Sequence, residues 1–179
     1  MLKIKSQVHQ YKDVRVKLPS LSFETGITIV QGKNGCGKST LFKSLCGLLT
    51  HPPKIKDYIY LPEQPSMPPK ITVKKYLDAL NALSNTSLNR VEYLIALFGL
   101  QDKSNKELSK LSKGMHQKVA LIGVLNENRT YYLLDEPFNG LDQKSLNKVC
   151  AYIKNMKGYI IIATHEKIPF LSDYKVIKL

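Results

Sequence analysis

The sequence predicts an α/β protein in which a parallel β-sheet is covered by helices on both sides. Short apolar runs alternate with longer helical stretches through the second half of the chain. The runs YYLL at 131–134 and YIIIA at 159–163 are apolar at every position, which is typical of strands buried on both faces of a sheet. With 179 residues, of which 43% are hydrophobic and 23% charged, the chain can bury a core within one domain. The same composition excludes a disordered or fibrous protein.

In the first half of the chain, the predicted elements surround a proline-rich segment. Residues 27–30 form a β-branched run that predicts a buried strand, and residues 41–49 predict a helix after it. The segment 51–70 holds six of the nine prolines, and proline removes amide donors and fixes φ. We therefore expect a connecting loop there, interrupted by a short strand at 58–61. Two helices are expected between about 73 and 98.

The second half gives the clearest alternation. A helix at 114–126 is predicted because Met115, Val119 and Ile122 fall on one face at the helical period. Ligands of parallel sheets sit at the carboxyl ends of the strands, so the residues after each strand are candidates for chemistry. The other expected elements are a strand at 131–134, a helix at 143–156, a strand at 159–163 and a closing strand at 174–179.

Charge is the unusual property of this composition. The 27 basic residues outnumber the 14 acidic ones and give a net charge of +13. Such a balance suggests a polyanionic partner, which is a nucleotide, a nucleic acid or an anionic membrane surface. The alternative is a solvated, lysine-rich surface. The basic residues are dispersed, and no dense basic block is flanked by aromatic residues.

The sequence contains no recognisable membrane-spanning segment or signal peptide, and its three cysteines show no metal-binding pattern. No apolar run approaches the roughly 20 residues that cross a bilayer. The segment MLKIKSQVHQYKD lacks the apolar core of a signal peptide, so we expect a chain that stays in the cytosol. Cys36, Cys46 and Cys150 lack metal-ligand spacing and are expected to be reduced thiols.

A glycine-rich loop follows the first predicted strand. Residues 32–40 read GKNGCGKST and fit the pattern G-x-x-x-x-G-K-[ST] between a strand and a helix. Glycines let successive backbone amides point at phosphate oxygens, and the N-terminus of the helix adds partial positive charge. Lys38 can reach the β- and γ-phosphates, and Ser39 is placed to ligate Mg²⁺. A tight glycine turn is the alternative, but the strand and helix on either side favour a nucleoside triphosphate site. The predicted nucleotide-binding residues of the loop are Asn34, Gly35, Cys36, Gly37, Lys38, Ser39 and Thr40.

Two later strands also end in residues that carry chemistry. Asp135 follows the strand at 131–134, where a carboxylate can hold the water shell of Mg²⁺, and Glu136 can polarise an attacking water. His165 follows the strand at 159–163. An ordinary acidic strand end and a surface or core histidine are the alternatives. The positions beside a phosphate loop favour the functional interpretation.

The helix expected at 114–126 has a polar start. Ser112 is a natural N-cap, and Gly114 keeps the backbone open to an approaching anion. Taken alone, this segment indicates a helix start with modest binding potential.

Together, these motifs resemble those of the nucleotide-binding domain of ABC transporters over nearly the whole chain. They occur in the family's order, and the ordered set is more specific than any single motif. Tyr11 lies where the family places an aromatic residue that stacks on adenine. The matching segments are the glycine loop as Walker A, LSKGM at 111–115 as the signature motif, YYLLDEP at 131–137 as Walker B with the catalytic glutamate, NGLD at 139–142 as the D-loop, and ATH at 163–165 as the switch-histidine segment.

The resemblance implies a P-loop NTPase core with a parallel sheet, a small N-terminal antiparallel β subdomain, and a helical subdomain that carries the signature motif. Residues 1–179 would form a single ABC ATPase domain, with the helical subdomain at roughly 65–126. Because the chain stops at the strand after His165, we expect a minimal cassette without the family's C-terminal helices.

Two motifs depart from the family's pattern. Met115 replaces the glutamine of the signature motif and weakens a polar contact. At the Q-loop, Glu63 stands where the family has glutamine, and Gln64 follows it. Either residue is a candidate for contact with Mg²⁺ and the lytic water, and Gln64 is assigned to the metal.

The resemblance also implies a mechanism with ATP and Mg²⁺. Two copies would face each other head to tail with two ATP molecules between them, so that Ser112 and Gly114 of one copy meet Walker A of the other. Glu136 would act as the base, and His165 would hold the γ-phosphate and the D-loop of the other copy. The resemblance also places Tyr11, Ser112, Gly114 and the D-loop residue Asp142 among the nucleotide-binding residues. The catalytic residues implied are Lys38, Glu136 and His165, and the metal ligands are Ser39, Asp135 and Gln64.

The expected function is that of an ATP-binding and ATP-hydrolysing subunit that powers a separate membrane permease. The subunit would lie at the cytoplasmic face of the membrane, as a homodimer or heterodimer, and the form of the signature motif favours export over import. The alternative is a soluble ABC-type ATPase that acts on nucleic acid or ribosomes. The net charge of +13 favours this alternative. Because the lysines are dispersed along the chain, we expect a transporter subunit that does not bind nucleic acid.

Overall fold

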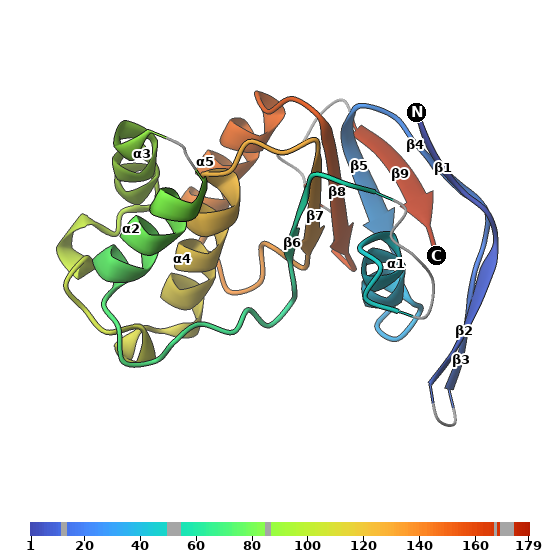
Figure 1. Cartoon of the computed structure of the whole chain (residues 1–179), viewed down its shortest axis with the longest axis horizontal. Helices are drawn as coiled ribbons and strands as arrows, with labels where there is room; N and C mark the ends of the chain where they lie inside the picture. The colour runs from blue at the N-terminus through green and yellow to red at the C-terminus, as the bar shows by residue number, and fades with distance from the viewer. Residues whose placement is uncertain (12–13, 50–54, 85–86, 167, 169–173) are drawn as a thin grey trace. The chain divides into compact units, whose positions relative to one another are not determined.

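The computed structural model describes residues 1–11, 14–49, 55–84, 87–166, 168 and 174–179 (Figure 1). The strands are β1 Leu2–Ile4, β2 Gln7–Tyr11, β3 Val14–Leu18, β4 Leu21–Phe23, β5 Gly26–Gln31, β6 Tyr58–Leu61, β7 Tyr131–Asp135, β8 Tyr159–Thr164 and β9 Tyr174–Lys178. The α-helices are α1 Lys38–Leu45, α2 Val73–Ser84, α3 Leu88–Phe98, α4 Lys113–Leu125 and α5 Gln143–Lys154, with the short 3-10 turns η1 Gln101–Lys103 and η2 Leu108–Lys110.

The chain divides into two compact units. The first unit comprises Met1–Glu63, Arg129–Pro137 and Tyr152–Leu179, and the second comprises Gln64–Asn128 and Phe138–Ala151. All nine strands named above belong to the first unit. Helices α2, α3 and α4 belong to the second.

A five-stranded sheet forms the centre of the first unit. Its order is β6-β7-β8-β5-β9, and every neighbouring pair is parallel. In its register Ile29 pairs with Ile162, and Leu133 pairs with Ile161. The parallel sheet predicted from the sequence is confirmed. Because all five strands are parallel, their carboxyl ends lie along one edge of the sheet, where ligands of such sheets bind.

Two antiparallel strand pairs precede this sheet along the chain. Strand β1 pairs with β4, and β2 pairs with β3 (Figure 1). They form the small N-terminal antiparallel part expected from the family resemblance.

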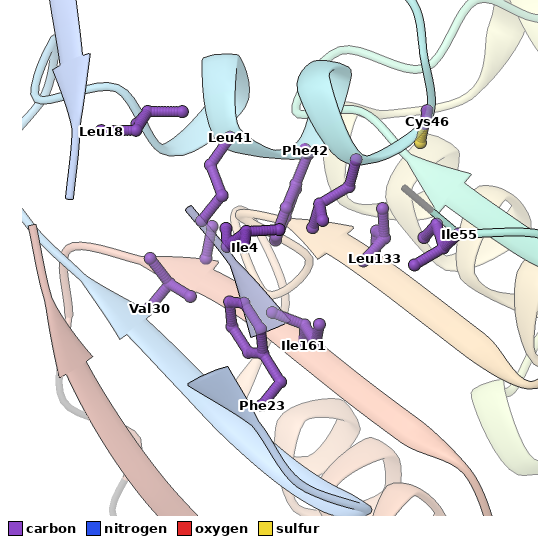
Figure 2. Close-up of a cluster of buried hydrophobic side chains, with 12 residues drawn as sticks. Ile4, Leu18, Phe23, Val30, Leu41, Phe42, Cys46, Ile55, Leu133 and Ile161 are labelled. Atoms are coloured by element: carbon purple, nitrogen blue, oxygen red, sulfur yellow. The ribbon is translucent and has the colours of Figure 1, made fainter. Parts of the chain in front are cut away.

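The core of the first unit lies beneath α1. Leu41 and Phe42 of this helix pack with Val30 and Ile161 of the sheet and with Phe23 of β4, and all five are buried (Figure 2). Burying each such side chain contributes about 1.5–3 kcal/mol. This packing fixes α1 over the carboxyl ends of the central strands, which determines where the loop between β5 and α1 lies.

The bounds of α1 differ from the sequence prediction of 41–49. The helix begins at Lys38, because Gly37 adopts φ 110° at the N-cap and lets the last residues of the loop form the first helical turn. It ends at Leu45, and Gly47 with φ 71° follows it. The helical pattern alone continued past this glycine.

In the second unit, α4 packs against α2 and α3. The predicted apolar face of α4 is only part of what is buried, because every residue from Val119 to Leu125 is buried while Met115 is half-buried. A helix buried all round is typical of the centre of a bundle. Arg90 of α3 donates to the carbonyl oxygen of Leu125 at 2.8 Å, so it satisfies a backbone group at the end of α4.

Candidate active site

The glycine loop between β5 and α1 contains positions that only glycine can occupy without strain. Gly35 and Gly37 adopt φ 81° and 110°, a region in which other L residues are strained. A Cβ on Gly37 would come within 2.7 Å of Val16 Cγ1, and a Cβ on Gly32 would collide with the sulfur of Cys36. The loop is therefore closely packed against its surroundings, with the thiol of Cys36 turned towards Gly32.

The loop borders a cavity of about 310 Å³. Six of the seven predicted loop residues line it, whereas Cys36 is not among them. On the other sides lie the residue after Pro62 and the two carboxylates that end β7. The lining residues are Asn34, Gly35, Gly37, Lys38, Ser39, Thr40, Glu63, Asp135 and Glu136. Every one of them belongs to the first unit.

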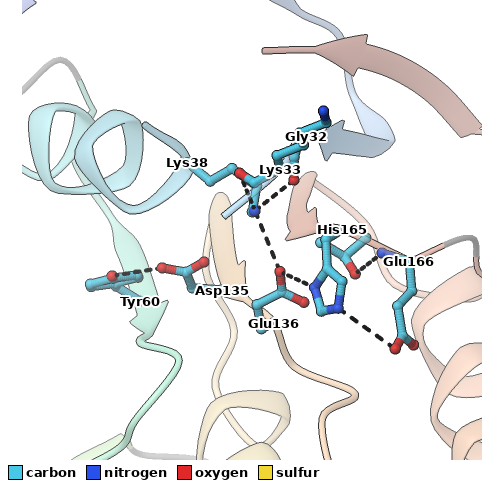
Figure 3. A network of polar contacts seen from close by, with 9 residues as sticks. Gly32, Lys33, Lys38, Tyr60, Asp135, Glu136, His165 and Glu166 are labelled. Carbon is cyan, nitrogen blue, oxygen red and sulfur yellow. Dashed lines mark hydrogen bonds and ion pairs between the residues drawn. The ribbon is translucent and has the colours of Figure 1, made fainter. Parts of the chain in front are cut away.

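Lys38 is held at the base of this cavity, with 7% of its surface exposed. Its ammonium donates to the carbonyl oxygen of Gly32 at 2.8 Å and to that of Lys33 at 3.3 Å (Figure 3). It also lies 3.6 Å from Glu136 Oε1. These contacts hold the ammonium at the cavity, where it can form charge-assisted hydrogen bonds with an anion.

Asp135 is buried at the end of β7, with 2% of its surface exposed. Burial raises the pKa of its carboxyl, the hydrogen bond from Ser39 opposes this rise, and the negative charges of Glu63 and Glu136 add to it. The hydroxyl of Tyr60 donates to Asp135 Oδ2 at 3.4 Å (Figure 3). The ring of Tyr60 packs edge-on against Phe42. The sequence analysis missed Tyr60. The local signal available in the sequence was its place in a predicted strand, two residues before Pro62.

Glu136 and His165 form a short hydrogen-bonded pair next to Lys38. His165 Nδ1 lies 2.9 Å from Glu136 Oε1 (Figure 3). The hydrogen bond to Glu136 and then its charge raise the pKa of His165, which favours the imidazolium. Glu136 adopts φ 47°, an uncommon value for a residue other than glycine. The backbone amide of Glu136 donates to Ala163 at 2.9 Å, so β8 helps to hold this conformation.

The residues at this site also suit Mg²⁺. Ser39 supplies a hydroxyl and Asp135 a carboxylate, and they are hydrogen-bonded to each other. Oxygen ligands of this kind are those that Mg²⁺ prefers. Among the described residues no group of three or more His, Cys, Asp or Glu side chains is arranged to hold a metal ion.

The two Q-loop candidates lie on different sides of the unit boundary. Glu63 lines the cavity in the first unit, whereas Gln64 is an exposed residue of the second unit. The assignment of Gln64 to the metal stays a prediction. The side chain of Tyr11, predicted to stack on adenine, lies outside the described part of the structure, although its backbone ends β2.

In the second unit, the signature segment and the D-loop lie together. The amide of Met115 donates to Ser112 Oγ at 3.3 Å, which confirms Ser112 as the N-cap of α4. A Cβ on Gly114 would collide with the carbonyl oxygen of Gly140, so glycine is required for the close contact of these two backbones.

Asp142 is fully engaged within the second unit. It accepts hydrogen bonds from the amide of Ser145 at 2.9 Å, from the Ser145 hydroxyl at 2.8 Å, and from Lys118 Nζ at 2.9 Å. The hydrogen bond from Lys118, followed by those from Ser145, holds the pKa of Asp142 well below its usual range. The carboxylate thus caps the start of α5 and ties it to α4.

Comparison with known proteins agrees with this geometry. Residues 16–139 match the ABC transporter family. The cytochrome c biogenesis ATP-binding export protein CcmA of Reclinomonas americana is 32% identical over 171 residues, which cover 82% of this chain and 76% of that protein. A putative ABC transporter ATP-binding protein from Pyrococcus furiosus has a similar structure, with a TM-score of 0.79, 26% identity, and coverage of 97% of this chain and 95% of that chain. The chain therefore belongs to the ABC transporter family, and its fold is that of the nucleotide-binding domain.

A further similar structure comes from a protein of another kind. It is the complex of the archaeal ribosomal stalk protein aP1 with the ribosome recycling factor aABCE1, with a TM-score of 0.81 and 25% identity. The match covers 98% of this chain but 36% of that chain. In the part of the chain that the structure describes, no helix is long and apolar enough to cross a membrane.

Proposed function

We propose that this chain is the ATP-binding and ATP-hydrolysing subunit of an ABC transporter, which powers a separate transmembrane permease. The observation that carries the proposal is the chain of contacts from Lys38 to Glu136 to His165, with distances of 3.6 and 2.9 Å, beside the glycine-lined cavity. This arrangement combines an anion-binding loop, a cation and a carboxylate base in one place.

The residues that line the cavity have different roles in ATP hydrolysis. The backbone amides of the loop and the ammonium of Lys38 bind the phosphate oxygens and stabilise the charge that develops on them. Ser39 and Asp135 would hold Mg²⁺, which would neutralise part of the phosphate charge. Glu136 accepts a proton from the attacking water as that oxygen bonds to the γ-phosphorus and the bridging oxygen leaves with ADP.

His165 positions the base and adds positive charge. The hydrogen bond between His165 Nδ1 and Glu136 Oε1 orients the carboxylate. The raised pKa of His165 favours the imidazolium cation, which would lie next to the γ-phosphate. Tyr60 plays a similar part for Asp135, because its hydroxyl restricts the rotation of that carboxylate.

The working form is a dimer of ATP-binding subunits, either two copies of this chain or this chain with a related one. Support comes from the signature segment, where Ser112 is exposed and caps a helix of 13 residues. The N-terminus of such a helix carries partial positive charge and suits a γ-phosphate held by the other copy. In this dimer Asp142 shapes the D-loop through its own hydrogen bonds.

The transporter exports its substrate, and the subunit works at the cytoplasmic face of the membrane. The relative from Reclinomonas americana is named as an export protein, and the form of the signature motif agrees with that direction. A protein named for molybdate or tungstate import also matches this chain, so the direction needs its own test.

The first experiment separates hydrolysis from binding. Glu136→Gln keeps the shape of the side chain but removes the base, so ATPase activity falls by about 10²- to 10⁴-fold while ATP binding persists. With ATP trapped, the variant elutes from gel filtration as a dimer more clearly than the wild type. Glu24→Gln, a carboxylate outside the cavity, is the control and retains activity. A change of less than threefold in Glu136→Gln would contradict the role of Glu136.

The second experiment tests the partner and the direction. ATPase activity is measured with a co-expressed candidate permease, reconstituted in vesicles of anionic lipid, and separately with structured RNA at physiological salt. We expect stimulation by the permease, ATP-dependent movement of substrate into inside-out vesicles, and no effect of RNA. A several-fold stimulation by RNA, without an effect of the permease, would instead support a soluble ATPase like the ribosome recycling factor.

A further inference from the structure

The cavity beside the glycine loop has an uneven balance of charge. Among the described side chains that line it, one ammonium, that of Lys38, faces three carboxylates, those of Glu63, Asp135 and Glu136. Lys38 is already 3.6 Å from Glu136, so this pair largely neutralises itself. Asp135 and Glu63 remain as negative charges in a cavity that has to accept a triphosphate.

Glu63 differs from the other two carboxylates in its surroundings. Asp135 has hydrogen bonds from Ser39 and Tyr60, and Glu136 has Lys38 and His165. Glu63 lies at the exposed rim, directly after Pro62 at the end of β6, and its charge acts on Asp135 through repulsion. Proline fixes the backbone just before it, which keeps the carboxylate near the cavity.

A negative charge at this rim affects free and metal-bound nucleotide differently. Like charges in a partly desolvated cavity repel more strongly than in bulk water, whereas a divalent cation between carboxylates and phosphates turns this repulsion into attraction. A neutral glutamine at the same position would remove the repulsion of free nucleotide and the attraction of the metal complex, so it would bring the two affinities closer together.

We propose that the charge of Glu63 makes nucleotide binding conditional on a divalent cation, so that this protein selects the metal complex of ATP over free ATP. This inference rests on the proposed function, because it concerns the same cavity. Since Glu63 is exposed and partly screened by solvent, we expect an effect on the order of tenfold in affinity.

The test is direct measurement of ATP affinity by isothermal titration calorimetry on the full chain. The ratio of the Kd in EDTA to the Kd in Mg²⁺ is compared for wild type, Glu63→Gln, Glu63→Asp and Glu24→Gln. We expect the ratio to fall about tenfold in Glu63→Gln, through tighter binding in EDTA. It stays at the wild-type value in Glu63→Asp, which keeps the charge, and in Glu24→Gln, which removes an acidic charge outside the cavity.

The possible outcomes are distinct. If Glu63→Gln leaves the affinity in EDTA unchanged and weakens binding in Mg²⁺, Glu63 is a metal ligand and the proposal is overturned. If Glu63→Gln and Glu24→Gln change the ratio equally, the effect is one of net charge and the proposal is also overturned. A wild-type protein that binds no ATP even with Mg²⁺ would refute the proposed function itself, whereas the first two outcomes leave it intact. Thermal unfolding of each variant checks that the fold is retained. If Glu63→Gln does not fold, Glu63→Ala, which also removes the charge, provides the same test.

Discussion

Lys118 Nζ donates a hydrogen bond to Asp142 Oδ2 at 2.9 Å, and this ion pair joins the signature helix α4 to the D-loop. The side chain of Lys118 is 15% exposed, whereas that of Asp142 is 58% exposed. The contact lies next to the close approach of Gly114 and Gly140. The signature segment and the D-loop are thereby held together by two separate contacts within the second unit.

The two functions of the Asp142 carboxylate can be separated by mutation. Asp142→Asn retains a good N-cap for α5 but loses the ion pair, so we expect a loss of up to about 1 kcal/mol in the free energy of unfolding. Lys118→Met should cost a similar amount, and the two changes should not add in a double-mutant cycle. Asp142→Ala also loses the cap and should cost about 1 kcal/mol more. Denaturant unfolding of the wild type, the three single variants and the double mutant measures these effects, and full additivity in the cycle would refute the coupling.

The same pair predicts a pH dependence of stability. The pKa of Asp142 is lowered in the folded state, so its stabilising contribution is present above the unfolded pKa of about 3.9. It is lost as the pH falls through the folded value. The difference in unfolding free energy between wild type and Asp142→Asn should therefore be constant from about pH 5 to 7 and should shrink in acid.

Lys38 is expected to supply most of the charge that binds phosphate. Lys38→Ala should weaken Mg-ATP binding by about a hundredfold or more, because the triphosphate loses its charge-assisted hydrogen bonds. Lys43→Ala, which removes an exposed lysine from the last turn of the same helix, is the matched control and should leave the affinity unchanged. Equal affinities of Lys38→Ala and wild type in calorimetry would exclude the loop as the nucleotide site.

The pair of Glu136 and His165 predicts a shifted histidine titration. The pKa of His165 is raised by Glu136, so the stability that this contact contributes is fully present below the unfolded pKa of about 6.5. It is lost as the pH rises through the folded value. In an NMR titration, Glu136→Gln should move the pKa of His165 back towards 6.5. His116, whose pKa is lowered by burial, is the internal reference and should not move. A His165 resonance that titrates identically in both proteins would contradict the contact.

Cys36 offers a chemical probe of the loop. It is half-buried, and its sulfur lies against Gly32, so a maleimide adduct should distort the loop and inhibit ATP binding. Cys46 and Cys150 are buried, and burial raises the pKa of Cys46 to about 11, so labelling at pH 7 should be selective for Cys36. Bound ATP should protect, and Cys36→Ser should be resistant. Undiminished ATPase activity after stoichiometric labelling would show that the thiol is irrelevant to the site.

Local sequence was sufficient for the elements and for the glycine loop. The strand at 58–61 was predicted with the bounds that β6 has, and the helix start at Ser112 followed from its capping side chain. Such features depend on neighbours along the chain, as do the positive φ angles of the loop glycines. The loop, Asp135, Glu136 and His165 could be named because ligands of parallel sheets bind where strands end.

The contacts between distant segments were decided only by the tertiary structure. Tyr60 reaches Asp135 because β6 and β7 are neighbours in the sheet, and Lys118 reaches Asp142 because the D-loop folds back onto α4. Neither distance can be read from a single sequence, since each depends on strand order and helix packing. The sequence by itself determined the class of site and the residues that carry charge. The tertiary structure decided how those charges are paired, because pairing depends on separations of 3 to 4 Å that packing alone sets.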